Sequence, residues 1–276
     1  MRSALTSAAW IGLALSTASV PVSAQQGGDE KQMTCDNGRY DGDRARHCEI
    51  REQSLPGIGR LNVDAGRNGG ATVKGWTRSD VLVRARIDAS ADNEGAARSM
   101  ASQVWIDGSG GEVHARGPEN IDNSWWSVSY EIFVPNNTDL TLKSHNGGLN
   151  ISDVRGQIHF EVNNGGVHLR RVGGDVSGST VNGGVQVDLT GNTFDGRQLE
   201  VSTRNGGVTI SMPSNYSAHI QAETNQGGIR SDFPLPMDGS TGSRPRRLDF
   251  HLAAGGPLIH VTTGNGQVSL KRSDTQ

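Results

Sequence analysis

The sequence predicts an all-β protein, a single-chain β-solenoid (β-helix-like) with rungs of about 18–23 residues and one short helix near the N-terminal part. Three observations predict this fold class. A short glycine phrase recurs at similar spacing, the segments beside it alternate between apolar and polar residues, and the composition is rich in glycine. With 38 glycines in 276 residues and only 5% aromatic residues, the core must consist of Val, Ile and Leu, as in folds of many short strands and tight turns.

The glycine phrase is Asn-Gly-Gly followed by an apolar, a polar and an apolar residue. Its second glycines are Gly148, Gly166, Gly184, Gly207 and Gly228, so the steps between them are 18, 18, 23 and 21 residues. Asn-Gly favours positive φ at two successive residues, so each copy should form a sharp corner between strands. For the same reason Gly166→Val should lower the stability by at least about 1 kcal/mol, whereas His168→Ala should cost little. The predicted structural turns are Asn146-Gly147-Gly148, Asn164-Gly165-Gly166, Asn182-Gly183-Gly184 and Asn205-Gly206-Gly207, with degenerate or outlying copies at Gln226, Asn265 and Asn68.

The segments that flank each phrase alternate with period two. Leu140 and Leu142 precede the first corner, and Leu149 and Ile151 follow it, so one face of each segment is expected to be buried. One rung alone buries too little apolar surface and must stack on its neighbours. Stacking would bring the corner asparagines into a ladder bonded side chain to side chain. Separate hairpins in an antiparallel sandwich are the alternative, because Asn-Gly is also the strongest hairpin signal.

Residues 1–24 have the features of a secretory signal peptide. A positive start at Arg2 and an apolar run from Ala4 to Val20 precede small residues up to Ala24, so the mature chain is expected to begin at Gln25. A retained membrane anchor is the alternative, but the apolar run is short and contains several Ser and Thr. No later stretch is long enough to span a bilayer, so the mature chain should carry no transmembrane segment. The protein is expected to be exported and to be periplasmic, at the cell surface or secreted.

Residues 25–54 form an N-terminal segment, partly irregular, that carries both cysteines, Cys35 and Cys48. Export would place them where disulfides persist, so a bridge between them is expected. Such a short loop would stabilise the fold by roughly 3 kcal/mol in the loop-entropy model. A redox or metal site that also uses His47 is the alternative, but two thiols and one His fall short of a zinc ligand set.

Residues 55–135 are expected to be β-rich with a short helix at 92–104, in which Asp92 is the candidate cap and Glu94 lies in the first turn. The alternating segment from Trp126 stops at Pro135. Residues 136–276 hold the repeat, which is interrupted by a long loop between Pro234 and Pro257 with a strand at 248–252, followed by a closing pair of strands.

These motifs resemble the bacterial putative adhesin domain family, a family of unknown function with Asn-Gly-Gly-Val β-solenoid repeats. The resemblance rests on the repeats, on the strand at 126–135 and on the Gly255-Gly256-Pro257 turn; it covers residues 125 to 272 and extends back toward Leu55. It implies a β-solenoid that is exported or membrane-linked and brings no catalytic motif. Gln226 and Gln267 depart from the repeat phrase, and the cysteine-bearing segment has no match in the family.

No arrangement of residues predicts catalysis, a metal site or a cofactor. His159 and His168 are expected on neighbouring strands and could approach each other, but no third ligand aligns with them. The Asp residues of the repeat fall at differing offsets from the corners, so stacking would not pair them as glycan hydrolysis requires. Without Arg2 the chain carries 25 basic and 29 acidic residues, a net charge of −4, which does not point to a nucleic-acid partner.

The remaining candidates for function lie on the surface. A polar stripe after the corners and one outward Trp are the weak candidates for binding, Trp125, Asn150, His168, Gln186, Thr209 and Arg230. The predicted function is a noncatalytic exported adhesin-like protein that presents a rigid surface to a protein or glycan partner. The alternatives are a structural or regulatory envelope protein that binds a partner of its own cell and, less favoured, a glycan-active β-helix enzyme.

Overall fold

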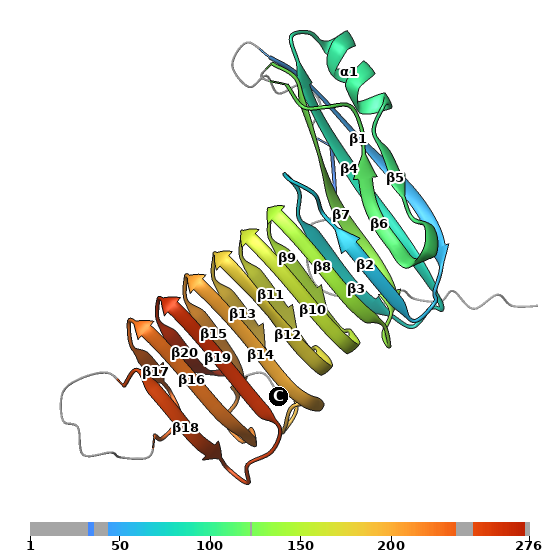
Figure 1. The fold of residues 1–276 in the computed structure, drawn as a ribbon. Helices are drawn as coiled ribbons and strands as arrows, with labels where there is room; N and C mark the ends of the chain where they lie inside the picture. The colour runs from blue at the N-terminus through green and yellow to red at the C-terminus, as the bar shows by residue number, and fades with distance from the viewer. Residues whose placement is uncertain (1–32, 36–43, 122, 236–244, 274–276) are drawn as a thin grey trace, which may run out of the picture. The chain divides into compact units, whose positions relative to one another are not determined.

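The computed structural model describes residues 33–35, 44–121, 123–235 and 245–273 (Figure 1). The predicted signal peptide and its cleavage site lie outside these residues. No helix in the described ranges has the length and apolar character needed to cross a bilayer.

Two ten-stranded sheets form the fold, and each repeat gives one strand to each sheet (Figure 1). The predicted β-solenoid is confirmed. The first sheet has the order β1 (Ala45–Pro56), β4 (Asp80–Ala91), β7 (Trp125–Pro135), β3 (Ala71–Trp76), β9 (Leu149–Ser152), β11 (Val167–Arg170), β13 (Val185–Asp188), β15 (Val208–Pro213), β20 (Val268–Ser273) and β17 (Ile229–Ser231). The second sheet has the order β18 (Arg247–Leu252), β16 (Ala218–Gln226), β19 (Leu258–Asn265), β14 (Gly196–Asn205), β12 (Gly173–Asn182), β10 (Arg155–Asn164), β8 (Asp139–Asn146), β2 (Arg60–Asp64), β6 (Glu112–Arg116) and β5 (Trp105–Asp107).

The repeat strands pair in parallel and in register. Within the second sheet, Asn164 of β10 lies opposite Asn146 of β8 and Asn182 of β12. Within the first sheet, Val167 of β11 lies opposite Leu149 of β9 and Val185 of β13. Because every rung repeats the same alternation, the inward side chains of both sheets meet in one continuous aliphatic core.

The order of the rungs in space differs from their order in the chain. Chain order alone would place the copy at Gly228 next to the copy at Gly207, but the structure does not. Instead, β19 and β20 insert between β14–β15 and β16–β17, so that Asn265 lies opposite both Asn205 and Gln226. At the other end, the β2–β3 rung stacks directly on β8–β9.

The returning chain covers the terminal rung. Strand β18 pairs antiparallel with β16, and the Ile229 N–H donates to the Pro245 carbonyl at 2.9 Å. Proline has no N–H to offer to a further strand, and β18 covers the edge of β16, so that β17 and β18 are the outer strands of the two sheets at this end.

The N-terminal part closes the opposite end with longer strands. Strand β4 pairs antiparallel with β1 and β7, and β7 pairs parallel with β3. Helix α1 (Glu94–Ser102) packs against β1 and β4, and η1 (Ser109–Gly111) is a short 3₁₀ turn. The cap of α1 is Asn93, whose side chain accepts from the Ala96 N–H at 2.9 Å, so the expectation for Asp92 is wrong.

Close backbone contact, and not positive φ, is the feature that the first glycines of the corners share. Among the glycines of the four full copies, only Gly206 has a φ in the left-handed region, at 158°. A Cβ on Gly165 would lie 2.3 Å from the Gly147 carbonyl oxygen, whereas a Cβ on Gly166 would lie 3.6 Å from the Gly184 oxygen, an ordinary contact. The expected strain at Gly166 is therefore wrong, and the first glycine of each phrase is the constrained one. Gln267 occupies the second-glycine position in its own rung.

The corner asparagines form a side-chain ladder. The Nδ2 of Asn164 donates to the Oδ1 of Asn146 at 2.8 Å, and Asn182 and Asn205 continue the series at 2.8 Å each. Asn68 and Asn265 extend it at the two ends, at 2.9 and 2.7 Å. Buried hydroxyls support several corners, because Thr180, Thr203 and Thr263 donate to the carbonyls of Gly165, Gly183 and Gly206. This second row of bonds was not predicted from the sequence.

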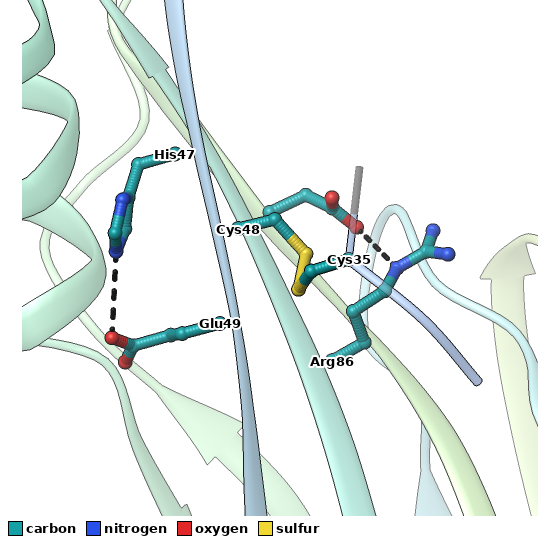
Figure 2. The surroundings of a disulfide bond; sticks show 6 residues. Cys35, His47, Cys48, Glu49 and Arg86 are labelled. Atoms are coloured by element: carbon teal, nitrogen blue, oxygen red, sulfur yellow. Dashed lines mark hydrogen bonds and ion pairs between the residues drawn. A yellow bond between two sulfur atoms is a disulfide. The ribbon is translucent and has the colours of Figure 1, made fainter. Parts of the chain in front are cut away.

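Cys35 and Cys48 form a disulfide with a Cα–Cα distance of 5.6 Å (Figure 2). The bridge joins the segment at residues 33–35 to β1. His47 points to Glu49, with 3.5 Å between Nε2 and Oε2. Both thiols are consumed by the bridge, so a metal site that needs free Cys35 and Cys48 is not formed.

Reduction of this bridge should lower the free energy of unfolding by about 3 kcal/mol, because it releases a closed loop in the unfolded chain. Urea unfolding with and without a reductant measures the effect. The double variant Cys35→Ala/Cys48→Ala should match the reduced protein and should not respond to the reductant. Equal midpoints for the oxidised and reduced protein would contradict a stabilising role.

Candidate functional site

The predicted polar stripe is a single row on the outer face of the first sheet. Strand register places Asn150, His168, Gln186 and Thr209 side by side in consecutive rungs. Arg230 is also in this row, but Ser269 lies between it and Thr209, because β20 is inserted before β17. Ser269 was not among the predicted residues, because its place in the row depends on the rung order.

A shallow groove runs beside this row across four rungs. Its volume is about 540 Å³. Strands in a sheet lie about 4.8 Å apart, so three intervals give a groove about 14 Å long. It is lined by Gly148, Asn150, Gly166, Val167, His168, Gly184, Val185, Gln186, Gly207 and Thr209.

The second glycines create this groove. None of Gly148, Gly166, Gly184 and Gly207 has positive φ, so their backbone conformation does not demand glycine. Without side chains at these positions, a ligand can reach the backbone. Gln267 brings a side chain to the same position in the next rung.

The polar groups beside the groove are fixed by a carboxylate. His168 Nε2 lies 2.6 Å from Asp188 Oδ2, and the Gln186 amide donates to the same carboxylate at 3.2 and 3.3 Å. Partial burial tends to raise the pKa of Asp188, but the hydrogen bonds from His168 and Gln186 outweigh it and hold this pKa below its ordinary value. The carboxylate therefore orients an imidazole and an amide of adjacent rungs.

Stability should fall when Asp188 is protonated. Because its folded pKa is depressed, its contribution is fully present above the unfolded value of about 3.9 and is lost as the pH falls through the lower folded value. Urea unfolding of wild type and Asp188→Asn at successive acidic pH values measures the contribution of the ionised Asp188 to the free energy of unfolding. The free-energy difference between them should shrink on acidification, and a constant difference would contradict it.

Trp125 does not lie in the groove. It starts β7, opposite Ser90 of β4, and the Arg46 guanidinium carbon lies 5.6 Å from the centroid of its ring. Its neighbour Trp126 packs against the core and donates from Nε1 to the Pro118 carbonyl at 2.7 Å. The weak binding candidates therefore separate into the groove row and an unrelated Trp.

The histidines do not meet as the sequence suggested. His159 belongs to β10 in the second sheet and bonds Ser177 at 3.1 Å, whereas His168 belongs to β11 in the first sheet. The expected approach of these two residues is wrong, because a corner separates their strands. Among the described residues no three His, Cys, Asp or Glu side chains are grouped so as to hold a metal ion.

A second pocket, with a volume of about 660 Å³, lies at the opposite corner of the rungs. The longer step between Gly184 and Gly207 comes from extra residues between β13 and β14, which line this pocket. Arg171 binds Asp153 through two bonds of 2.7 Å, and Arg155 pairs with Asp195. The irregular step of 23 residues was the one signal for this pocket, since insertions in a repeat often mark a ligand-binding face.

Comparisons with known proteins agree with this architecture. The model of the family described as Toastrack DUF4097 matches residues 98–271. No curated protein matches the chain.

Several solved structures are similar to it. One is a putative cell adhesion protein from Clostridium sporogenes, 11% identical, with 82% of this chain and 100% of that chain covered and a TM-score of 0.42. Another is a putative adhesin from Bacteroides fragilis, 8% identical, with 82% and 97% covered and a TM-score of 0.31. A putative adhesin from Parabacteroides merdae is 10% identical, with 86% and 99% covered and a TM-score of 0.31.

Proposed function

This chain belongs to the Toastrack DUF4097 family of domains of unknown function, and we propose that it is a noncatalytic adhesin-like protein whose groove on the first sheet binds a protein or glycan outside the cytoplasm. The observation that carries the proposal is the row of four second glycines, of which Gly166, Gly184 and Gly207 are exposed and Gly148 is partly exposed. Their φ angles do not require glycine, and a Cβ on them would lie 3.1 to 3.6 Å from a carbonyl oxygen of the next rung, yet together they keep a groove open across four rungs.

The groove is suited to an extended, uncharged polar ligand. Its polar lining residues are Asn150, His168, Gln186 and Thr209, which offer amide, imidazole and hydroxyl groups at regular intervals. The parallel ladder and the asparagine ladder fix these intervals, so a ligand would meet a preformed surface and little conformational entropy would be lost on binding. The Asp188 carboxylate is held by His168 and Gln186, and a role in orienting these groups is consistent with binding.

The location outside the cytoplasm is supported by the disulfide between Cys35 and Cys48. Stable structural disulfides are typical of exported proteins and rare in the cytosol. The predicted signal peptide would provide the route. Export itself is tested by fractionation of cells that express the full-length chain.

Binding of the mature chain to glycan and matrix-protein arrays tests the function. Gly166→Val should abolish binding to whatever the wild type captures, because its side chain fills the groove at a position where a Cβ makes ordinary contact. Ser179→Val is the matched control, since it adds the same side chain to an exposed position of the second sheet. Equal binding by both variants would contradict the groove as the site.

A partner within the cell's own envelope is the alternative. Absence of binding on the arrays, together with an envelope protein that co-purifies with wild type and Ser179→Val but not with Gly166→Val, would favour it. Turnover of a glycan that is lost after one acidic substitution would contradict both binding hypotheses and indicate an enzyme.

A further inference from the structure

The corner phrase places the dipeptide Asn-Gly in six rungs, and this dipeptide is the one most prone to spontaneous deamidation. The reaction needs the glycine nitrogen to attack the side-chain carbonyl of the asparagine, because glycine has no Cβ to obstruct the approach. The fold must therefore restrain a reactive sequence that it repeats. The six dipeptides begin at Asn68, Asn146, Asn164, Asn182, Asn205 and Asn265; a seventh, at Asn37, lies outside the described residues.

Five of the six attacking nitrogens are engaged in hydrogen bonds between rungs. The Gly147 N–H donates to the Asn164 carbonyl at 3.0 Å, and the Gly165 N–H donates to the Asn182 carbonyl at 2.9 Å. Gly183, Gly206 and Gly266 donate in the same way, at 3.0, 3.0 and 2.9 Å. Attack requires loss of this hydrogen and movement of the nitrogen toward the side chain, so each bond opposes the reaction.

The other parts of these corners are also held. The ladder holds the side chains of all six asparagines at 2.7 to 2.9 Å, including Asn68, whose Oδ1 accepts from Asn146. Close packing does not distinguish the corners, because a Cβ on Gly165 would lie 2.3 Å from the Gly147 carbonyl oxygen and a Cβ on Gly69 would lie 1.9 Å from the Val128 carbonyl oxygen. The engaged glycine N–H is therefore the feature that separates the five corners from Asn68-Gly69. Reaction at these sites therefore requires local opening of the rung.

The two ends of the stack differ from its middle. Each bonded glycine N–H donates to the next rung in the direction from β8 to β16. The glycine N–H of the last rung, that of Gly227, therefore has no next rung to accept its hydrogen bond. At that rung the residue before Gly227 is Gln226, not Asn. Glutamine cyclises much more slowly, because its longer side chain would form a six-membered imide.

At the first rung the register is different. The Asn146 N–H donates to the Arg67 carbonyl at 3.0 Å, and within the described chain the Gly69 N–H donates no hydrogen bond. Asn68 itself is exposed. Asn68-Gly69 is thus the one described Asn-Gly dipeptide in which the attacking nitrogen is not engaged.

We propose that Asn68 is a spontaneous deamidation site of the folded protein and that stacking protects the other five dipeptides. The Gly69 nitrogen loses its proton and bonds to the Asn68 Cγ, the Cγ–Nδ2 bond breaks, and ammonia leaves. Water then opens the resulting succinimide and gives aspartate or isoaspartate. The modified residue adds a negative charge at one end of the asparagine ladder.

Incubation of the mature protein in mildly alkaline buffer, followed by peptide mapping, tests this proposal. In the folded protein Asn68 should deamidate at least about tenfold faster than the five dipeptides of Asn146 to Asn265, because those must first open locally. In denaturant all six should react at comparable rates. Similar rates in the folded protein at Asn68 and at Asn164 would overturn the proposal, as would protection of Asn68.

A substitution at the far end tests the same mechanism independently. Gln226→Asn creates an Asn-Gly dipeptide in the last rung, where the Gly227 N–H has no further rung to which it could donate. In the folded variant residue 226 should deamidate at least about tenfold faster than Asn265, whose following N–H is bonded. Equal, slow reaction at both positions would show that the bond between rungs is not the protecting element. A thermal melt that matches wild type ensures that the comparison is made on a folded variant.

Discussion

Gly165→Ala should lower the free energy of unfolding by about 3 kcal/mol, the largest effect expected for so small a change. The added Cβ would lie 2.3 Å from the Gly147 carbonyl oxygen and 2.6 Å from its carbon. Both are backbone atoms in a rung that is paired on each side, so no flexible side chain can move away. Relief requires a shift of the rung, which would weaken the Gly165 N–H bond to Asn182 and the Thr180 bond to the Gly165 carbonyl.

The matched control is the adjacent glycine. Gly166→Ala adds the same methyl group 3.6 Å from the nearest neighbouring atom, at an exposed position with no positive φ, and should change the stability by less than about 0.5 kcal/mol. Urea unfolding of both variants measures the difference. Equal destabilisation would mean that glycine is needed for chain flexibility and not for close stacking.

Phe160→Ala should destabilise the protein by about 3–5 kcal/mol. Phe160 is fully buried, and its ring fills the space left by the absence of a side chain on Gly178 in the next rung. A Cβ on Gly178 would lie 2.4 Å from the nearest atom of this ring. Truncation therefore opens a cavity between paired rungs, which the parallel ladder cannot easily collapse.

Combining substitutions at Phe160 and Gly178 tests whether these two residues pack directly against each other. Gly178→Ala should be destabilising in the wild type but much less so in Phe160→Ala, because the methyl group then enters the cavity. Glu161→Ala, at the exposed neighbouring position, controls for loss of a side chain on β10. Additive effects of the two core substitutions would contradict direct packing between residues 160 and 178.

Local repetition made the main architecture predictable. The Asn-Gly-Gly phrase and the alternation around Leu142 and Leu149 are short-range patterns, and each rung reuses them with the same outcome. The side-chain ladder through Asn164 follows from the same reasoning, because identical corners one rung apart must stack. The disulfide between Cys35 and Cys48 was predictable because the chain offers only one pairing.

The role of the two glycines was not predictable from local propensity. Asn-Gly indicates positive φ in isolated turns, but in a stack the neighbouring carbonyl determines which position must lack a side chain. Gly165 meets that carbonyl and Gly166 does not. Thus the same dipeptide signal predicted the corner correctly and gave the wrong reason for it.

By itself, the sequence determined that short alternating strands turn at glycine corners and stack into rungs, because those features depend on neighbouring residues. Only the tertiary structure decided that β19 and β20 insert before β16, that Ser269 joins the polar row and that extra residues after β13 line a second pocket. These features depend on which strands of the two sheets the C-terminal strands pair with. That choice depends on hydrogen bonds between segments far apart in the chain, such as the bond from Asn265 to Asn205, 60 residues away, and no local pattern encodes it.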